Sequence, residues 1–516
     1  MVTASGFVLA TALWYSVVSA AEAQNCSSVA AIATQTCQQL ERSLGSTIVQ
    51  TQSSGSEYAI GANFAWSTFS DEVNFQPSCI VFPNTTQHVQ TAMKAIFENK
   101  ADYAVQAGGH SGMIGWNTVQ NGVLISFMNM NSTSYDSESD TITLLPGIHW
   151  GDATSALQQY GVAPVGGRIA TVGTGLLLGG GISYLSPAEG YAADNYVSLD
   201  VVLVNGTLVT ATADNEYADL FKALKGGGNR FGIVTKYVVK AVHTGTEDEK
   251  RWFGGLLVYP NSSSEALLAA LAHFIHDTAD PNAGTCAVIV LVLATTFRTT
   301  WENSTQDIEL DVILVYNGTE ASFNTSFAEF LSIPYTSSAL QALSYLDLLN
   351  AVTFPDGLGT LFGASALTGV PASTLADQYL ETYRLYNNFS TAFASSTDIA
   401  FTLLDFSPVP KSQIQAGYEK GTNPIVPPLG TGGYFEILFQ VTYAEGITEP
   451  SPDVEQGRQL WISTAPSTPG LPFFLNEADA NQQILATYGG YEFLKQVYAK
   501  YDPTSYLSIL YGPPNT

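Results

Sequence analysis

Two glycine-rich stretches constrain the fold of this chain more than any other feature. The first is Ala107-Gly108-Gly109-His110-Ser111-Gly112, and the second runs from Val172-Gly173-Thr174 to Gly179-Gly180-Gly181. Glycine lets successive backbone N–H groups converge on an anion, because no Cβ stands in the way. The two stretches therefore predict paired backbone cradles for one pyrophosphate, with His110 beside whatever cofactor they hold.

The pattern around these stretches alternates between short apolar runs and helical spacing, which predicts an α+β fold. Strands are expected at 79–82, 103–106, 123–127 and 141–144, and helices at 86–99 and 150–160. The dipeptide Asn205-Gly206 between two β-rich runs predicts a hairpin. Residues 53–70 are polar and predict a loop.

After residue 251 the runs of β-forming residues become longer, which predicts a large antiparallel sheet backed by helices. The runs expected as strands are 253–259, 286–296, 308–316 and 434–443, and the segments expected as helices are 263–276 and 480–500.

The sequence lacks the other common cofactor-binding motifs. Three leucines follow Gly173-Thr174-Gly175, so the dinucleotide fingerprint G-x-G-x-x-G is incomplete, and no lysine follows Gly181 as a P-loop requires. No set of cysteines and histidines has zinc spacing. His273, His276 and Asp277 suit a solvated helix face better than a metal site, so no metal is expected.

In their order along the chain, the motifs resemble those of the vanillyl-alcohol-oxidase/p-cresol-methylhydroxylase flavoproteins, and more narrowly the berberine-bridge-enzyme-like secreted fungal oxidases. The matching stretches are Gly109-His110-Ser111, Gly166-Gly167-Arg168, the run from Val172 to Gly181, Gly226-Gly227-Gly228, Phe231-Gly232-Ile233-Val234-Thr235, Leu475-Asn476 and Tyr501-Asp502-Pro503.

The resemblance implies FAD, with a covalent bond from His110 to the flavin 8α-methyl group. It also implies a two-subdomain FAD-binding domain of the PCMH type and a substrate domain. The expected boundaries are an N-terminal helix and loop at 24–72, the FAD-binding domain at 73–245, the substrate domain at 246–470 and a returning C-terminal segment at 471–516. The expected cofactor-binding residues are Gly108, Gly109, His110, Ser111, Gly112, Val172, Gly173, Thr174, Gly179, Gly180, Gly181, Gly232, Ile233, Val234 and Asn476.

Two departures from the family pattern matter for the chemistry. Many relatives carry a second attachment through a cysteine at the position of Ile169, so no cysteinyl link is expected here. Asn476-Glu477 stands where Asn-Tyr is usual, so the tyrosine base of some relatives cannot be carried over.

Candidates for the catalytic base therefore come from local patterns. Alternation along 434–443 puts Tyr434, Glu436 and Gln440 on one face and only apolar residues on the other. A carboxylate on the polar face of a buried sheet would be partly desolvated, which raises its pKa toward that of a useful base. Glu436 is thus one candidate, and Tyr434 on the same face is a second residue that could reach the substrate. The alternative for Glu436 is a solvated or ion-paired glutamate. Glu477 is a further candidate, unless it marks the loss of oxidase chemistry.

Charge and processing signals indicate a secreted glycoprotein. The net charge of −27 argues against nucleic acid and anionic membranes as partners. Apolar residues 7–18 followed by Ala21-Glu22-Ala23 predict a signal peptide at 1–23, hence no membrane anchor in the mature form. Among four cysteines we expect Cys37 to pair with Cys79, with four free thiols as the alternative. Nine N-glycosylation sequons start at Asn25, Asn84, Asn131, Asn205, Asn261, Asn303, Asn317, Asn324 and Asn388.

These features predict a secreted FAD-dependent oxidoreductase. Its substrate would be a small alcohol-bearing molecule, either a sugar or a secondary metabolite, and dioxygen would reoxidise the flavin. An oxidative cyclase, a dehydrogenase with another acceptor and a catalytically decayed flavin-binding protein remain as alternatives.

Overall fold

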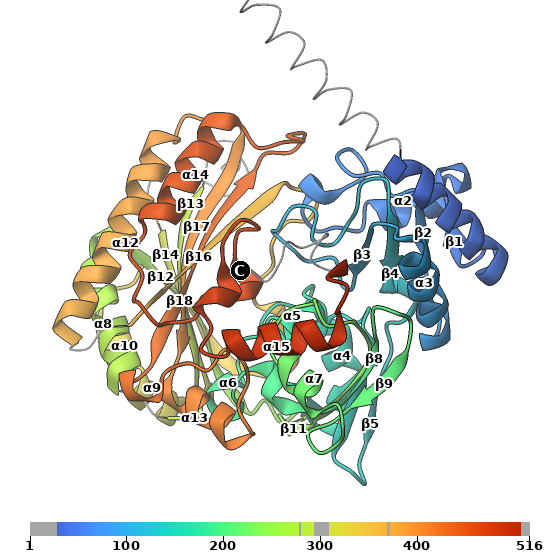
Figure 1. Ribbon diagram of the computed structural model, residues 1–516. Helices are drawn as coiled ribbons and strands as arrows, with labels where there is room; N and C mark the ends of the chain where they lie inside the picture. The colour runs from blue at the N-terminus through green and yellow to red at the C-terminus, as the bar shows by residue number, and fades with distance from the viewer. Residues whose placement is uncertain (1–27, 278–279, 294–308, 369–371, 507–516) are drawn as a thin grey trace, which may run out of the picture.

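Three large β-sheets and a two-stranded one make up the sheet structure of the protein in a computed structural model, which describes residues 28–277, 280–293, 309–368 and 372–506 (Figure 1). The predicted signal peptide, Asn25, Cys26 and Asn303 lie outside these residues. The three large sheets surround the centre of the protein. Two smaller sheets from the N-terminal half stand on one side, and one seven-stranded sheet stands on the other. Both α and β elements are present throughout, so the predicted α+β class is confirmed.

The first small sheet positions the first glycine-rich loop. Its strands, in spatial order, are β1 (Val49–Gln50), β2 (Cys79–Val81), β4 (Val123–Ser126) and β3 (Tyr103–Gln106). β2, β4 and β3 are parallel, and α3 (Thr86–Asn99) makes the crossover between β2 and β3. The predicted disulfide between Cys37 and Cys79 is present and joins a helix over residues 28–44 to β2.

The second small sheet is antiparallel and carries the predicted hairpin. Its strands, in spatial order, are β5 (Thr133–Asp136), β6 (Thr141–Leu144), β10 (Ile233–Lys240), β8 (Tyr196–Val202) and β9 (Leu208–Ala211). Gly206 has φ +83° at the turn between β8 and β9, a conformation that glycine adopts without strain. Helices α4 (Trp150–Leu157), α5 (Gly175–Leu178), α6 (Ser186–Glu189) and α7 (Ala218–Ala223) complete this half.

The seven-stranded antiparallel sheet forms the second half. Its strands, in spatial order, are β15 (Ser337–Leu343), β12 (Trp252–Pro260), β14 (Glu309–Asn317), β13 (Ala283–Leu293), β17 (Ile399–Val409), β18 (Tyr434–Tyr443) and β16 (Thr360–Leu367). Its helices include α8 (Ser264–Asp277), α10 (Ala328–Ser332), α12 (Ala372–Ala392) and α14 (Pro452–Thr464), which cover the outer face (Figure 1).

The two faces of this sheet bury different partners. On β18, the apolar set Phe435, Ile437, Phe439, Val441 and Tyr443 packs in the core under the helices. Tyr434 and Leu438 pack instead in the core shared with the small sheets. The alternation read from the sequence therefore holds in space. Because both faces are covered, all ten residues of β18 are buried.

Two local predictions were wrong. Residues 53–70 contain the helix α2 (Ser56–Ala62), because Tyr58 and Ala62 bury their side chains against Ile80 and Phe82 of the first sheet. The polar composition hid this small apolar face.

The predicted helix at 480–500 is broken into a 3-10 turn (Ile484–Thr487) and α15 (Tyr491–Tyr501). The backbone N–H groups of Gly489 and Gly490 donate to the carbonyls of Ile425 and Pro424 instead of continuing a helix. α15 then packs on α7, where Lys500 pairs with Asp219 at 2.6 Å. Among the described helices, none combines the length and apolar character needed to span a bilayer.

Candidate active site

The two glycine-rich loops touch each other through their backbones. An ideal Cβ on Gly108 would lie 2.7 Å from Cα of Gly173, and a Cβ on Gly173 would lie 2.6 Å from Cα of Gly108. Only hydrogen fits at both positions. His149 reinforces the junction, since its Nε2 lies 3.0 Å from the Gly108 carbonyl oxygen. The close approach brings both predicted cradles to one place.

His110 is held in this junction with a free ring nitrogen. Its imidazole stacks on Trp66, with ring centroids 4.1 Å apart and an interplanar angle of 13°. Within the part of the chain that the structure describes, its buried Nδ1 has no hydrogen-bond partner. Burial, assisted by the neighbouring His149, lowers the pKa of His110 to about 3, so the ring is neutral at physiological pH. A neutral imidazole with an unpaired nitrogen is a competent nucleophile.

A cavity of about 310 Å³ opens between the loops and the inner face of the large sheet. We call its two sides the loop wall (residues 107–111 and 172–179) and the sheet wall. The sheet wall consists of Ile313 on β14, Phe362 on β16, Leu403 and Asp405 on β17, and Leu438 and Gln440 on β18.

A charged cluster lies where the two walls meet. Arg168 Nη2 is 3.4 Å from Glu477 Oε1 and 3.9 Å from Asp405 Oδ2, and all three residues line the cavity. Ser407 Oγ donates to Asp405 Oδ2 at 2.8 Å. Asp405 Oδ1 and Glu477 Oε2 are both buried, and neither has a hydrogen-bond partner among the described residues. One guanidinium therefore faces two carboxyl groups that each keep one oxygen free.

The electrostatics of the cluster favour a shared proton. Burial raises the pKa of Glu477 to about 7; Arg168 opposes this rise and Asp405 adds to it. Burial also raises the pKa of Asp405, against the effect of Arg168. Because one cation cannot compensate two buried negative charges, a proton resides on the pair near neutral pH.

Glu436 and Tyr434 lie away from the cavity. Neither lines it, although Glu436 is on the same face of β18 as Leu438 and Gln440, which do. Glu436 pairs across the strands with Ser407, one step beyond Asp405. Tyr434 accompanies it in a buried network, where its hydroxyl lies 2.6 Å from that of Tyr191. Burial raises the pKa of Glu436 well above its ordinary value.

The structure gathers most of the predicted cofactor residues on the cavity surface. Those that line it are Gly108, Gly109, His110, Ser111, Val172, Gly173, Gly179, Gly232, Ile233, Val234 and Asn476. Gly112, Thr174, Gly180 and Gly181 support the loops from behind. Gly112 abuts the Phe362 ring, and the Thr174 hydroxyl donates to the Pro146 carbonyl at 2.6 Å.

Asp405 was missed by reasoning from the sequence, although a signal for it exists. It is the single charged residue in β17, a strand of eleven buried residues that is otherwise almost entirely apolar. A lone carboxylate in such a strand has to be explained by a site. Arg168 was noted only as part of a motif, because its partners are more than two hundred residues away in sequence.

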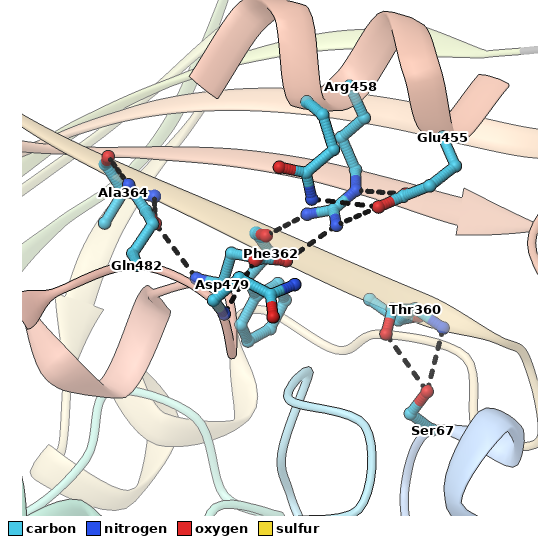
Figure 2. A network of polar contacts seen from close by, with 10 residues as sticks. Ser67, Thr360, Phe362, Ala364, Glu455, Arg458, Asp479 and Gln482 are labelled. Atoms are coloured by element: carbon cyan, nitrogen blue, oxygen red, sulfur yellow. Dashed lines mark hydrogen bonds and ion pairs between the residues drawn. The ribbon is translucent and has the colours of Figure 1, made fainter. Parts of the chain in front are cut away.

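The edge strand β16 holds both sides of the site in place (Figure 2). Ser67, beside Trp66, exchanges two 3.0 Å hydrogen bonds with the backbone of Thr360. Gln482 does the same with Ala364, at 2.8 and 2.7 Å. An edge strand leaves one row of backbone N–H and C=O groups without a neighbouring strand. In β16, some of these groups bond to Ser67, next to the Trp66 that stacks on His110, and to Gln482, which follows Glu477 in the chain.

Arg458 of α14 completes this arrangement. Its guanidinium is buried, pairs with Asp479 at 2.6 Å and with Glu455 at 2.7 Å, and donates to the Phe362 carbonyl (Figure 2). Asp479 is two residues from Glu477, so Arg458 fixes the backbone that presents the cavity carboxylate.

Comparisons with known proteins agree with this geometry. Residues 77–212 match the family model described as an FAD binding domain. An uncharacterised FAD-linked oxidoreductase of Arthroderma benhamiae is 32% identical over 350 residues, which are 67% of this chain and 63% of that protein. An FAD-dependent monooxygenase of Arthrobotrys oligospora is 28% identical over 503 residues, covering 92% of this chain and 88% of the relative.

Solved structures share the fold. Berberine bridge enzyme from Eschscholzia californica superposes with a TM-score of 0.71 at 16% identity, over 93% of this chain and 99% of that one. Carbohydrate oxidase from Microdochium nivale gives 0.70 at 19% identity, over 92% and 98%. The chain is thus similar to FAD-linked oxidoreductases, and its fold is that of berberine bridge enzyme.

The residues present fit the cofactor of this family. The loop wall is free of Cβ atoms where its two backbones meet, as a pyrophosphate cradle requires. Gly179 abuts Asn476, since an ideal Cβ would lie 2.3 Å from its Oδ1, and this buried oxygen has no hydrogen-bond partner in the described ranges. The unpaired Nδ1 of His110 lies on the same cavity. The loops, His110 and Asn476 are thus the groups that would hold FAD.

Proposed function

We propose that this protein is a secreted oxidase that removes a hydride from a small alcohol-bearing substrate and passes it to FAD attached to His110. The observation that carries the proposal is the convergence of Asp405, Glu477 and Arg168 in the cavity that also reaches His110. When bound there, FAD accepts the hydride from the carbinol carbon.

The chain's own residues supply binding and proton handling. Backbone N–H groups of the loop wall hold the pyrophosphate, and the neutral His110 provides the attachment nitrogen. Ile169 lines the cavity without a thiol, so a single covalent link is proposed.

Glu477 is the favoured acceptor of the hydroxyl proton. It lines the cavity, has an unpaired Oε2, and its pKa of about 7 suits a base at neutral pH. Arg168 beside it stabilises negative charge on the substrate oxygen as the proton leaves. Glu436 and Tyr434, the other candidates from the sequence, are off the cavity surface; this supports a role behind the site, not at the substrate.

Secretion, glycosylation and the use of dioxygen belong to the same proposal. The seven sequon asparagines in the described part of the chain are all exposed, which glycan attachment requires. The Cys37–Cys79 disulfide suits an oxidising compartment. Carbohydrate oxidase from Microdochium nivale, which shares the fold, supports oxygen as acceptor.

Anaerobic mixing of the flavin-loaded protein with alcohols tests the function. Bleaching of the flavin absorbance, followed by its return and stoichiometric hydrogen peroxide on admitting air, is the expected result. Bleaching without peroxide would indicate a dehydrogenase. A panel of sugars and aromatic alcohols that leaves the absorbance unchanged would favour the decayed or cyclase alternatives.

A further inference from the structure

We infer that the substrate is a neutral alcohol with an apolar, ring-sized body, which presents one hydroxyl group to Arg168, Asp405 and Glu477. This inference rests on the proposed function and narrows it, because the sequence left sugars and secondary metabolites both open as substrates. The side chains that line the cavity at and beside the sheet wall decide between these two substrate classes.

Apolar side chains dominate that surface. The sheet wall contributes Ile313, Phe362, Leu403 and Leu438, and the segment before β16 adds Val352 and Phe354. Phe354 is half-buried and stacks on Phe401, with centroids 6.5 Å apart and an interplanar angle of 18°. Flat aromatic and branched aliphatic groups of this kind bind the faces of rings.

Polar groups on the sheet wall are few. Apart from Asp405, the polar residue of the sheet wall is Gln440, whose Nε2 donates to Thr442 Oγ1 at 2.9 Å. A sugar would bury several hydroxyl groups against this surface. Each one left without a partner lowers affinity by roughly tenfold. The site therefore suits one hydroxyl and disfavours many.

Charge excludes an acidic substrate. Arg168 is the only lysine or arginine among the described residues that line the cavity, and it already faces two carboxyl groups. An added carboxylate would find no uncompensated cation there. The net charge of −27 also repels anions approaching from solution.

The test compares three probes by isothermal titration and by anaerobic bleaching of the flavin-loaded protein. The probes are 2-naphthylmethanol, cellobiose and 2-naphthoate. We expect the naphthyl alcohol to bind at least tenfold more tightly than either of the others and to be the probe that bleaches the flavin.

The outcomes separate this inference from the proposed function. Tighter binding or faster bleaching by cellobiose overturns the apolar substrate class and leaves alcohol oxidation standing. Tighter binding of 2-naphthoate than of 2-naphthylmethanol would contradict the inference that the substrate is neutral. Binding of the naphthyl alcohol without bleaching supports the ligand class and contradicts the oxidase function. Binding of none of the three overturns the inference.

A pair of variants ties the result to the cavity surface. Phe354→Asn should weaken binding of 2-naphthylmethanol by roughly tenfold, because an aromatic contact is lost and a polar group is buried. Thr353→Asn is the matched control, since Thr353 is exposed on the same segment and does not line the cavity. Equal affinities for the two variants would place the apolar body of the ligand elsewhere.

Discussion

The loop wall and the sheet wall of the cavity differ in the atoms that carry their chemistry. The loop wall consists of two contiguous stretches of chain that meet at Gly108 and Gly173. Its chemistry comes from backbone groups and from His110. The sheet wall and the adjoining cluster work through side chains from separate strands and from the C-terminal segment, brought together only by folding. A change in the loop wall should therefore act through shape and attachment, whereas a change at the cluster should act through charge.

The largest expected effect is the loss of flavin attachment when His110 is replaced. His110→Ala removes the nitrogen proposed to bond the flavin, so acid precipitation should release all of the flavin, whereas the parent keeps it in the pellet. Absorbance of pellet and supernatant measures this. Ser111→Ala, next to it on the loop wall, should retain the flavin. Flavin that stays with the His110→Ala pellet would place the linkage on another residue.

At the cluster, Glu477→Gln keeps size and hydrogen bonding but removes the proton acceptor. Flavin reduction should slow by roughly 10²–10⁴-fold with unchanged flavin content, measured by anaerobic stopped flow. Glu436→Gln should have a much smaller effect, because Glu436 is buried off the cavity surface. The reverse ranking of these two variants would return the base to Glu436.

The support of the cluster can be tested at Arg458. Arg458→Gln leaves Asp479 buried without its cation, which should lower the free energy of unfolding by about 3–5 kcal/mol in chemical denaturation. Arg384→Gln is the control, since the ion pair of Arg384 with Glu381 is exposed at the surface, and it should change stability by less than about 0.5 kcal/mol. Equal effects would mean that the buried ion pair does not fix the segment after Glu477.

Two glycines of the loop wall provide a steric comparison. Gly108→Ala should lower stability by about 1–3 kcal/mol, because its Cβ would meet the Gly173 backbone. Gly175→Ala places its Cβ in open space and should be neutral or slightly stabilising in the first turn of α5. Thermal unfolding of both variants measures the difference, and similar melting temperatures would show that the loops can separate without cost.

The pH dependence is the smallest expected effect, and it should come from Glu477 and not from the loop wall. Glu477 has a raised pKa of about 7, so its basic form is populated above that pH and is lost as pH falls. Flavin reduction should drop about tenfold for each pH unit below 7, and this limb should disappear in Glu477→Gln. His110 is neutral throughout this range, because burial lowers its pKa to about 3, so the loop wall adds no titration. A limb that persists in the Glu477→Gln variant would assign it to another group.

Much of the fold was predictable from local patterns. α3 at Thr86–Asn99, β3 at Tyr103–Gln106 and β18 at Tyr434–Tyr443 have the bounds read from the sequence, because periodicity and flanking residues define them locally. The helix α2 and the break before α15 were not predicted, because each depends on a distant partner: Phe82 and Ile80 for α2, and the backbone of Pro424 and Ile425 for Gly490 and Gly489.

The α+β class and the two glycine-rich loops could be predicted from contiguous residues. The Cys37–Cys79 pairing was favoured from the sequence, with four free thiols as the alternative. Which carboxylate reaches the cavity depends instead on contacts that form on folding. Glu436 and Glu477 are both plausible bases in the sequence, but sheet register turns Glu436 toward Ser407 and Tyr434, while the docking of residues 479–482 on β16 presents Glu477 to Arg168. The physical reason is that burial and neighbouring charge, which set a pKa, depend on residues far apart in the chain.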